Sequence, residues 1–280
     1  MTDRYAVFGN PLGHSKSPII HARFAAETGE DLTYGKVEAP VDGFEAALRQ
    51  FIAGGGSGCN VTAPFKLEAF ALATAMTPEA AMAGATNTLR FTDGGIEAHN
   101  TDGVGLLADV ERILRAPLRG KRALMLGAGG AARGAVLPFL DAAPAAFVMI
   151  NRTPSKAQAI RDELLAAGHH GLSLADFDTT DRFDVVINAT SASLTGECPA
   201  IPSRAFEGCE LAYELAYAKG LTPFLSRARD ADVRTLADGV GMLVGQAAVA
   251  FEWWRGVRPT IRNLIETLSI PLERPARQLP

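Results

Sequence analysis

The chain has 280 residues, enough for two domains, and its 48% hydrophobic and 21% charged residues are typical of a globular protein with a sizeable core. A formal net charge of −4 argues against nucleic acid and against an anionic membrane as partners. No stretch approaches the roughly 20 apolar residues of a membrane-spanning helix, and no secretory leader opens the chain. The three cysteines, Cys59, Cys198 and Cys209, lack metal-ligand spacing and favour reduced thiols in the cytoplasm.

The first hundred residues predict an open α/β sheet. Strands are expected at 4–9, at 32–38 and around Cys59-Asn60-Val61-Thr62, and a hairpin at 88–91 and 96–99. A first helix should begin at Ser17-Pro18 and end before Gly29, a second has its apolar face on Phe44, Leu48 and Phe51, and a third follows Lys66.

A glycine motif opens the second region. Residues 123–126 are a short apolar run, typical of a strand buried on both faces, and a helical stretch follows at 130–141. Gly127, Gly129 and Ala132 between them fit G-x-G-x-x-G/A, in which the glycines permit a tight turn and close approach of a pyrophosphate. The helix N-terminus then attracts phosphate. This predicts a dinucleotide site that also includes Ala128, Gly130 and Ala131.

The next apolar strand, 146–150, ends in a basic rather than an acidic segment. An NAD site usually places a carboxylate here for the ribose 2′-hydroxyl. This chain has Asn151, Arg152, Thr153 and Lys156 instead, which suits the 2′-phosphate of NADP(H). The alternative is an ordinary helix start, with Thr153 as cap and Pro154 in the first turn, and two solvated cations. That alternative does not explain the whole strand-glycine-helix-strand series.

Further strands are expected at 184–189, 210–215 and 233–236 with helices between them, which predicts a parallel, doubly wound sheet. A long apolar helix is expected at 241–254 and a last helix from 259 to 268. The fold class is therefore α/β with two domains, an open α/β domain and a Rossmann-like doubly wound domain.

Polar residues gather in four short motifs of the first domain. Each motif has an ordinary explanation, since Ser17 or Asp102 could cap a helix, Thr62 suits a strand and Asn87 can start a hairpin. Together they suit a small substrate rich in hydroxyl groups, with Lys16 or Lys66 meeting a carboxylate. Lys66 with Asp102 would form an acid/base pair able to protonate the alkoxide that hydride transfer to a carbonyl creates. The motif residues are Ser15, Lys16 and Ser17; Asn60, Thr62 and Lys66; Asn87; and Asn100, Thr101 and Asp102.

With these motifs in order, the chain resembles the shikimate dehydrogenase family from Val7 to about Gly256. The resemblance is carried by His14-Ser15-Lys16-Ser17-Pro18, Asn60-Val61-Thr62-Ala63-Pro64-Phe65-Lys66, Gly84-Ala85-Thr86-Asn87-Thr88, Asn100-Thr101-Asp102-Gly103, Gly127 to Arg133, Asn151-Arg152-Thr153, Asn188-Ala189-Thr190-Ser191, Tyr217 to Pro223 and Gly239 to Gln246.

The resemblance implies reversible NADPH-dependent reduction of 3-dehydroshikimate to shikimate, without a metal. It implies a discontinuous substrate-binding domain, residues 1–102 with 240–280, and an NADP-binding domain, residues 103–239. It assigns proton transfer to Lys66 with Asp102 as its partner. It also assigns the substrate carboxylate to Ser15, Ser17 and Tyr217, the ring hydroxyls to Asn60, Thr62, Asn87 and Gln246, and the nicotinamide to Leu215, Gly239 and Met242.

Two alternatives remain. One is an NAD-dependent quinate/shikimate dehydrogenase, against which Arg152 and the paired serines argue; the other is a regulatory protein that kept the fold without catalysis. A zinc enzyme is unexpected, because the five histidines lack ligand spacing. Three positions depart from the family pattern: Thr86, Ser193 and Leu215. Oligomeric state is open, a homodimer being one option.

Overall fold

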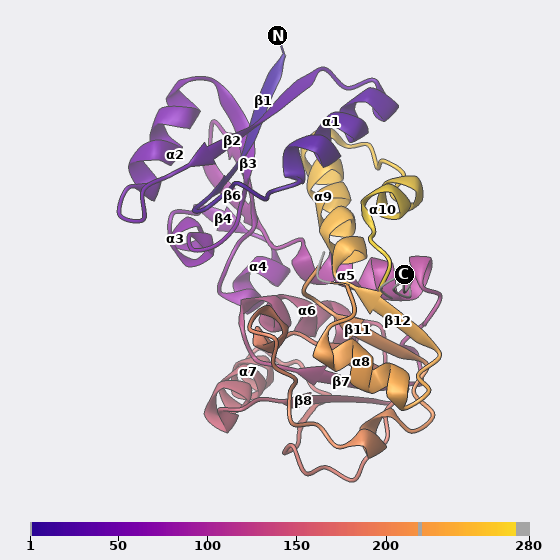
Figure 1. Ribbon diagram of the computed structural model, residues 1–280. Coiled ribbons are helices and arrows are strands. Elements are labelled where there is room, and N and C mark those ends of the chain that lie inside the picture. Colours follow the sequence, from indigo (N-terminus) through magenta and orange to yellow (C-terminus); the bar gives the residue numbers. More distant parts are fainter. Residues whose placement is uncertain (1, 218–219, 273–280) are drawn as a thin grey trace, which may run out of the picture. The chain divides into compact units, whose positions relative to one another are not determined.

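The computed structural model describes residues 2–217 and 220–272, and its chain forms two compact units (Figure 1). The first unit comprises the residues up to Gly105 together with Val244–Leu264, and the second comprises Leu106–Leu243 and the described residues from Ile265. Leu272 packs against the apolar core of the second unit. The domain bounds that the resemblance implies, 1–102 with 240–280 and 103–239, stay a prediction.

The first unit contains a mixed six-stranded sheet in the order β2-β1-β3-β5-β6-β4. β1 pairs in parallel with β2 and β3, whereas β5 is antiparallel to β3 and forms the predicted hairpin with β6. The strands are β1 (Asp3–Gly9), β2 (Leu32–Glu38), β3 (Gly56–Val61), β4 (Ala75–Met76), β5 (Thr88–Thr92) and β6 (Gly95–His99). The helices are α1 (Ser17–Thr28), α2 (Phe44–Ala53), α3 (Lys66–Ala71), α4 (Pro78–Ala83) and most of α9 (Val240–Arg255).

An aromatic cluster fixes the start of α3 in the first unit. Phe44, on the buried face of α2, meets Phe8 edge-on at 5.9 Å and stacks on Phe65 at 4.8 Å between ring centroids. Phe65 is 2% exposed and immediately precedes α3. Burial of Phe65 therefore holds the neighbouring Lys66 at a set place.

The second unit contains an all-parallel sheet in the order β12-β11-β10-β7-β8-β9, which confirms the predicted parallel, doubly wound sheet. Its strands are β7 (Arg122–Leu126), β8 (Ala146–Ile150), β9 (Leu172–Leu174), β10 (Val185–Asn188), β11 (Leu211–Glu214) and β12 (Thr235–Asp238). All residues of β10 and β11 are buried, as expected when helices cover both faces. The last strand begins two residues later than predicted, and the very short β4 and β9 were not predicted.

Helices of the second unit are α6 (Gly130–Asp141), α7 (Pro154–Ala166), α8 (Pro223–Asp230) and part of α10 (Arg262–Leu268), with 3-10 turns at Ala192–Leu194 and Ser203–Phe206. The bounds of α6 agree with the prediction, whereas α10 begins three residues later than expected. Helix α5 (Asp102–Ala108) continues into a π-helical turn, Asp109–Ile113.

The backbones of α5 and α9 touch at two glycines. A Cβ added at Gly105 would lie 2.3 Å from the backbone nitrogen of Gln246, and one at Gly245 would lie 2.8 Å from the carbonyl oxygen of Gly105. Both positions therefore require glycine. The contact brings Gln246 beside the start of α5.

Replacing Gly105 by alanine tests this contact. Glycine to alanine inside a helix ordinarily stabilises by about 1 kcal/mol. Here we expect the unfolding free energy to fall by roughly 1–3 kcal/mol, because the methyl group meets backbone that cannot turn aside. Urea unfolding measures the change. Gly94→Ala is the matched control, since the nearest atom to its added Cβ is Thr92 Oγ1 at 3.6 Å. A stabilised Gly105→Ala protein would contradict the close approach.

His21 lies in the core of the first unit, and neither of its ring nitrogens is hydrogen-bonded to a described residue. Its ring is 1% exposed and stacks on Tyr34 with 4.2 Å between centroids. Burial lowers the pKa of His21 to about 3 from the ordinary 6.5, and the nearby Asn60 side chain opposes this shift only in part. The imidazole is therefore neutral in the folded protein at ordinary pH.

Acid should destabilise the fold through His21. Between pH 6.5 and about 3, His21 is protonated in the unfolded chain and neutral in the folded chain. The unfolding free energy should therefore fall as pH drops through this window, by up to about 1.4 kcal/mol per pH unit. Urea titrations of His21→Phe should show a shallower slope than the parent. The exposed His169→Phe should keep the parental slope, and equal slopes for all three proteins would contradict the assignment.

Candidate active site

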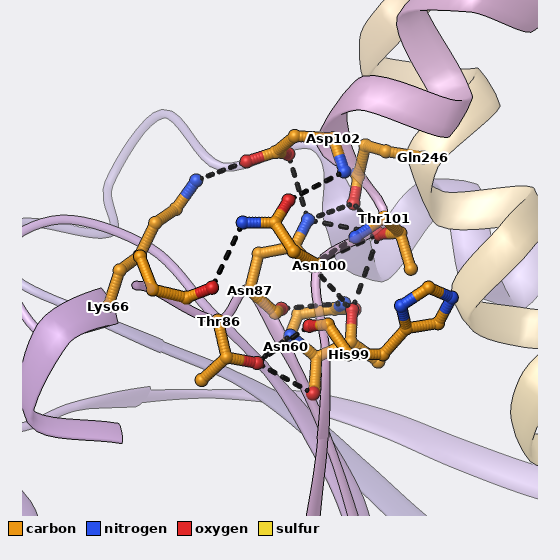
Figure 2. A network of polar contacts seen from close by, with 11 residues as sticks. Asn60, Lys66, Thr86, Asn87, His99, Asn100, Thr101, Asp102 and Gln246 are labelled. Carbon is orange, nitrogen blue, oxygen red and sulfur yellow. Dashed lines mark hydrogen bonds and ion pairs between the residues drawn. The ribbon is translucent and has the colours of Figure 1, made fainter. Parts of the chain in front are cut away.

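A lysine and a carboxylate form the centre of the polar site in the first unit (Figure 2). Lys66 is the first residue of α3 and Asp102 the first residue of α5, and Lys66 Nζ lies 2.6 Å from Asp102 Oδ2. Their side chains are 31% and 10% exposed, so solvent or a ligand can reach the ammonium group. Asp102 directs its carboxylate at Lys66 and Asn87, so the sequence alternative of a helix cap does not describe it. The two residues paired from sequence therefore meet in space.

Asn87 orients that carboxylate. Its amide nitrogen donates to Asp102 Oδ1 at 2.8 Å and to Thr101 Oγ1 at 3.0 Å, and its amide oxygen accepts from the Thr101 backbone N–H at 2.9 Å. The amide nitrogen of Asn87 faces acceptors and its amide oxygen faces a donor, so only one orientation of the side chain satisfies these bonds. Asn87 is also 4% exposed. In the structure the Asn87 side chain holds the carboxylate of Asp102. A hydrogen bond from Asn87 to a ring hydroxyl of the substrate stays a prediction.

Two neighbours complete this network. Gln246, from α9, accepts hydrogen bonds at Oε1 from Asn87 at 3.3 Å and from Thr101 Oγ1 at 3.4 Å. Asn100 donates to the Ala85 carbonyl and accepts from the Asp102 backbone N–H, which fixes the turn before α5. A residue 159 positions from Asn87 thus joins the same group, as Figure 2 shows.

Asn60 and Tyr34 form a second pair in this unit. Asn60 donates to Thr88 Oγ1 at 3.0 Å and to the Asn87 carbonyl at 3.2 Å, and its amide oxygen accepts from the Tyr34 hydroxyl at 2.7 Å. Sequence analysis missed Tyr34, because an aromatic residue in a strand is indistinguishable from an ordinary core residue.

The serine motif and Thr62 lie on the loops that follow β1 and β3. Ser15 Oγ and Ser17 Oγ are 3.4 Å apart, so the two hydroxyls do face one another. Ser17 is the first residue of α1 after its N-cap, Lys16, and its backbone N–H donates to Ser15 Oγ at 3.4 Å. Thr62 follows β3 directly and its backbone N–H donates to the Phe8 carbonyl, which leaves its half-buried side chain beyond the strand end. Substrate contacts of these residues stay predictions.

In the second unit the glycine loop is shaped for an anionic group. Gly127 has φ +107°, and a Cβ there would lie 3.0 Å from the Ala189 carbonyl oxygen. No atom of a described residue lies within 4 Å of a Cβ at Gly129 or Gly130, so a ligand can approach the backbone closely. Helix α6 begins at Gly130 without a side-chain cap or an acidic residue in its first turn. Its first N–H groups are available to phosphate, and the loop, which includes Ala128 and Ala131, fits a dinucleotide.

The segment after β8 offers cations beside that loop. Asn151 ties it to the loop, because its amide oxygen accepts from the Ala128 N–H at 3.1 Å and its nitrogen donates to the Thr153 carbonyl. Thr153 occupies the N-cap position of α7, but its hydroxyl makes no capping bond. Arg152 and Lys156 are exposed and form no ion pair with any described residue. Two exposed cations and one hydroxyl can meet the 2′-phosphate of NADP(H), and the assignment of these residues to it stays a prediction.

The predicted nicotinamide residues also converge. A Cβ at Gly239 would lie 2.1 Å from the Leu215 carbonyl oxygen, so these two backbones touch. The backbone N–H of Met242 donates to the hydroxyl of Tyr213 at 3.0 Å. Sequence analysis missed Tyr213, whose position in an apolar strand gives no sign of a polar role.

The three departures from the family pattern are internal. Thr86 is fully buried and donates to the His99 carbonyl at 2.6 Å and to the Thr88 carbonyl at 2.9 Å. Ser193 donates to the buried carboxylate of Glu214. Leu215 keeps its backbone contact with Gly239. Thr86 and Ser193 therefore satisfy buried polar groups.

One predicted site residue, Tyr217, takes no part in the contacts described above. Tyr217 is 36% exposed and belongs to the second unit, and residues 218–219 of its motif lie outside the described residues.

Within the described ranges no three His, Cys, Asp or Glu side chains could share a metal ion. No described helix combines the length and apolar character needed to span a membrane.

The fold and these two groups define a two-unit α/β protein with a Rossmann-like sheet, a dinucleotide-binding loop and a lysine–carboxylate pair. Three family models match it: the shikimate dehydrogenase substrate-binding domain at 7–89, shikimate/quinate 5-dehydrogenase at 109–196 and the shikimate 5′-dehydrogenase C-terminal domain at 239–267. The chain belongs to the shikimate dehydrogenase family.

Relatives and solved structures agree with this assignment. Shikimate dehydrogenase (NADP(+)) of Nitrosospira multiformis is 49% identical over 98% of this chain and 100% of the relative. The same-named protein of Methylobacillus flagellatus is 51% identical over 95% and 98%. An Ael1 enzyme from Pseudomonas putida is 53% identical with a TM-score of 0.94, covering 97% of this chain and 100% of that one. Shikimate 5-dehydrogenase from Thermus thermophilus, in complex with NADP(H) and shikimate, is 30% identical with a TM-score of 0.85, covering 95% and 98%.

Replacing Asn87 by aspartate should expose its contact with Asp102. The new carboxylate would face Asp102 Oδ1, where Asn87 now donates from 2.8 Å. Two adjacent carboxylates repel when both are ionised, so we expect a larger loss of unfolding free energy at pH 8 than at pH 5. Asn87→Ala removes the same donor without adding charge, and its loss of roughly 1–3 kcal/mol should vary little with pH. Urea unfolding of both variants at pH 5 and pH 8 measures these losses. Losses that change equally with pH in the two variants would contradict the contact.

Proposed function

We propose that the protein catalyses the reversible NADPH-dependent reduction of 3-dehydroshikimate to shikimate, a step towards chorismate and the aromatic amino acids. The observation that carries the proposal is the 2.6 Å contact between Lys66 and Asp102, with Asn87 holding the second carboxylate oxygen. Membership of the family and relatives named for this activity support it.

Lys66 is the proton donor for the carbonyl that is reduced, and its neutral form accepts the proton in the reverse direction. Bound NADPH supplies the hydride. Asp102 keeps the flexible lysine at one place, and Asn87 prevents the carboxylate from turning away. Positioned proton transfer of this kind contributes roughly 10²–10⁴-fold to a rate.

Substrate binding is assigned to the remaining polar groups of the first domain, proposed as residues 1–102 with 240–280, and to Tyr217. A cyclohexene ring carrying a carboxylate and hydroxyls needs donors at one end and amides or hydroxyls along its edge. We assign the carboxylate to Ser15, Ser17 and Tyr217, and the ring hydroxyls to Asn60, Thr62, Asn87 and Gln246. The paired hydroxyls of Ser15 and Ser17, 3.4 Å apart, support the first assignment.

Cofactor binding is assigned to the second domain, proposed as residues 103–239, and to Met242. The open backbone of the glycine loop suits the pyrophosphate, and the two exposed cations after β8 suit the 2′-phosphate. The residues are Gly127, Ala128, Gly129, Gly130 and Ala131 for the pyrophosphate; Asn151, Arg152, Thr153 and Lys156 for the adenosine ribose and its phosphate; and Leu215, Gly239 and Met242 for the nicotinamide. The proposed reaction uses no metal.

We also propose that the protein works in the cytoplasm and as a homodimer. Free Cys59, Cys198 and Cys209 suit a reducing compartment. Exposed apolar side chains such as Val41 and Leu67, 68% and 67% exposed, offer surface to a second copy. Light scattering on the purified protein measures its mass.

Turnover with shikimate tests the function. Reduced nicotinamide absorbance should rise with shikimate and NADP, and much less with quinate or with NAD. Lys66→Ala should lower kcat by roughly 10²–10⁴-fold, because the proton then comes from water. Lys121→Ala is the matched control: Lys121 forms an ion pair of the same 2.6 Å length with Glu210, and neither residue is assigned to substrate or cofactor.

Each outcome bears on a different part of the proposal. Parental turnover by Lys66→Ala would refute the proton-transfer role. Preference for NAD would refute the role of Arg152, and preference for quinate would refute the substrate. No turnover by the folded parent in any mixture would leave the regulatory protein as the better description.

A further inference from the structure

A buried carboxyl group that the proposed reaction does not use lies beneath the start of α9. Asp109, at the beginning of the π-helical turn, is 2% exposed. Its Oδ2 accepts a hydrogen bond of 2.8 Å from the hydroxyl of Tyr213, which is fully buried on β11. A π-turn inside a helix often marks a functional site. The contact therefore needs an explanation beyond core packing.

The direction of these hydrogen bonds is fixed. Burial and the nearby Asp109 raise the pKa of Tyr213 well above its ordinary value, so the hydroxyl keeps its proton. That proton goes to Asp109, and the hydroxyl oxygen accepts from the backbone N–H of Met242 at 3.0 Å. Met242 is in the first turn of α9, where N–H groups have no partner within the helix. Tyr213 thus connects the carboxyl to the start of α9.

The carboxyl group itself also shapes this segment. A Cβ at Gly241 would lie 1.9 Å from Asp109 Oδ2 and 2.0 Å from its Cγ, so the carboxyl rests directly on the Gly241 backbone. Burial raises the pKa of Asp109 to about 6, as does Asp238, while the Tyr213 hydrogen bond lowers it. A carboxyl group whose pKa is raised by burial in this way is often part of a functional site.

The same segment is held from a second side. The backbone N–H of Gly239 donates to the Ala216 carbonyl at 3.3 Å, and Gly239 lies against the Leu215 carbonyl. Tyr213, Leu215 and Ala216 are consecutive or nearly so at the end of β11, so one strand end fixes the whole stretch 239–242. This stretch contains two of the residues assigned to the nicotinamide.

We infer that Tyr213 and Asp109 are positioning residues that hold Gly239 and Met242 in place for the nicotinamide end of NADP(H). The inference rests on the proposed function for the assignment of Gly239 and Met242. Neither Tyr213 nor Asp109 needs to touch the cofactor. Their task is to fix the backbone that does so, and Gly241 is the residue that permits their approach.

Binding of two ligands separates this role from general stability. Tyr213→Phe keeps the ring but removes the partner of the Met242 N–H. Calorimetry should show the Kd for NADP⁺ rising about three- to tenfold, the range expected for one lost hydrogen bond. The Kd for 2′-phosphoadenosine diphosphoribose, which lacks the nicotinamide, should stay at the parental value.

Asp109→Ala removes the acceptor of the Tyr213 hydroxyl, so it should weaken NADP⁺ as Tyr213→Phe does and leave the shorter ligand at the parental Kd. One further variant serves as a control. Tyr5→Phe removes a phenol from the core of the first unit and should alter neither Kd. Equal weakening of both ligands in Tyr213→Phe, or no weakening of NADP⁺, would overturn the inference.

Hydrogen exchange of the Met242 amide gives a readout that needs no cofactor. The amide should be protected in the parent and exchange faster in Tyr213→Phe. Unchanged protection of the Met242 amide in Tyr213→Phe would refute the positioning role, whatever the Kd values of the two ligands. A parent that binds neither ligand, with Met242 exchange accelerated in the variant, would refute the proposed function and leave the hold on α9 standing.

Discussion

The polar site of the first unit depends on the single orientation of the Asn87 amide. The amide bonds to Asp102 and Thr101 at the start of α5 and to Gln246 on α9, while Asn87 itself begins the hairpin. A buried amide whose donors and acceptors are all engaged cannot turn without leaving several groups unsatisfied. Asp102, and through it Lys66, therefore has a fixed direction, although the Lys66 side chain is 31% exposed. The hydrogen bonds explain why a long, flexible lysine can have a defined place.

Close backbone contact is the second constraint. Gly105 lets α5 touch α9, Gly239 lets the start of α9 touch Leu215, and Gly241 leaves room for the carboxyl group of Asp109. Each glycine lies where a side chain would strike backbone or a buried polar group. Two of these contacts involve α9 and the third involves the residue just before it; α9 itself carries Gln246 in the first unit and Met242 in the second. Small residues thus bring together segments that are distant in sequence.

The two buried or partly buried acid groups differ in what surrounds them. Asp102 has a cation at 2.6 Å and some exposure, an arrangement suited to exchanging protons with a ligand. Asp109 has only a phenol as its described hydrogen-bond donor and almost no exposure, so its pKa rises to about 6. A charge in such a place costs stability without reaching a substrate, which suits a role in holding backbone.

The sequence by itself determined the periodic and local features. The strand bounds 32–38 and 146–150, the helix 130–141, the parallel order of the second sheet and the glycine loop all follow from patterns within about thirty residues. The pairing of Lys66 with Asp102 was also proposed from residue chemistry, and the resemblance placed Gln246 with the first domain.

Only the tertiary structure decided which groups bond to which. Tyr34, Tyr213 and Asp109 look like core or surface residues in the sequence, because a hydroxyl or carboxyl has no pattern until its partner is known. Asn87 and Gln246, which hydrogen-bond to one another, lie 159 positions apart, and the short strands β4 and β9 exist only because neighbours supply their hydrogen bonds. Hydrophobic periodicity is a property of one segment, whereas hydrogen bonding and close packing are properties of two. The fold class therefore followed from the sequence, and the directions of the side chains in the site did not.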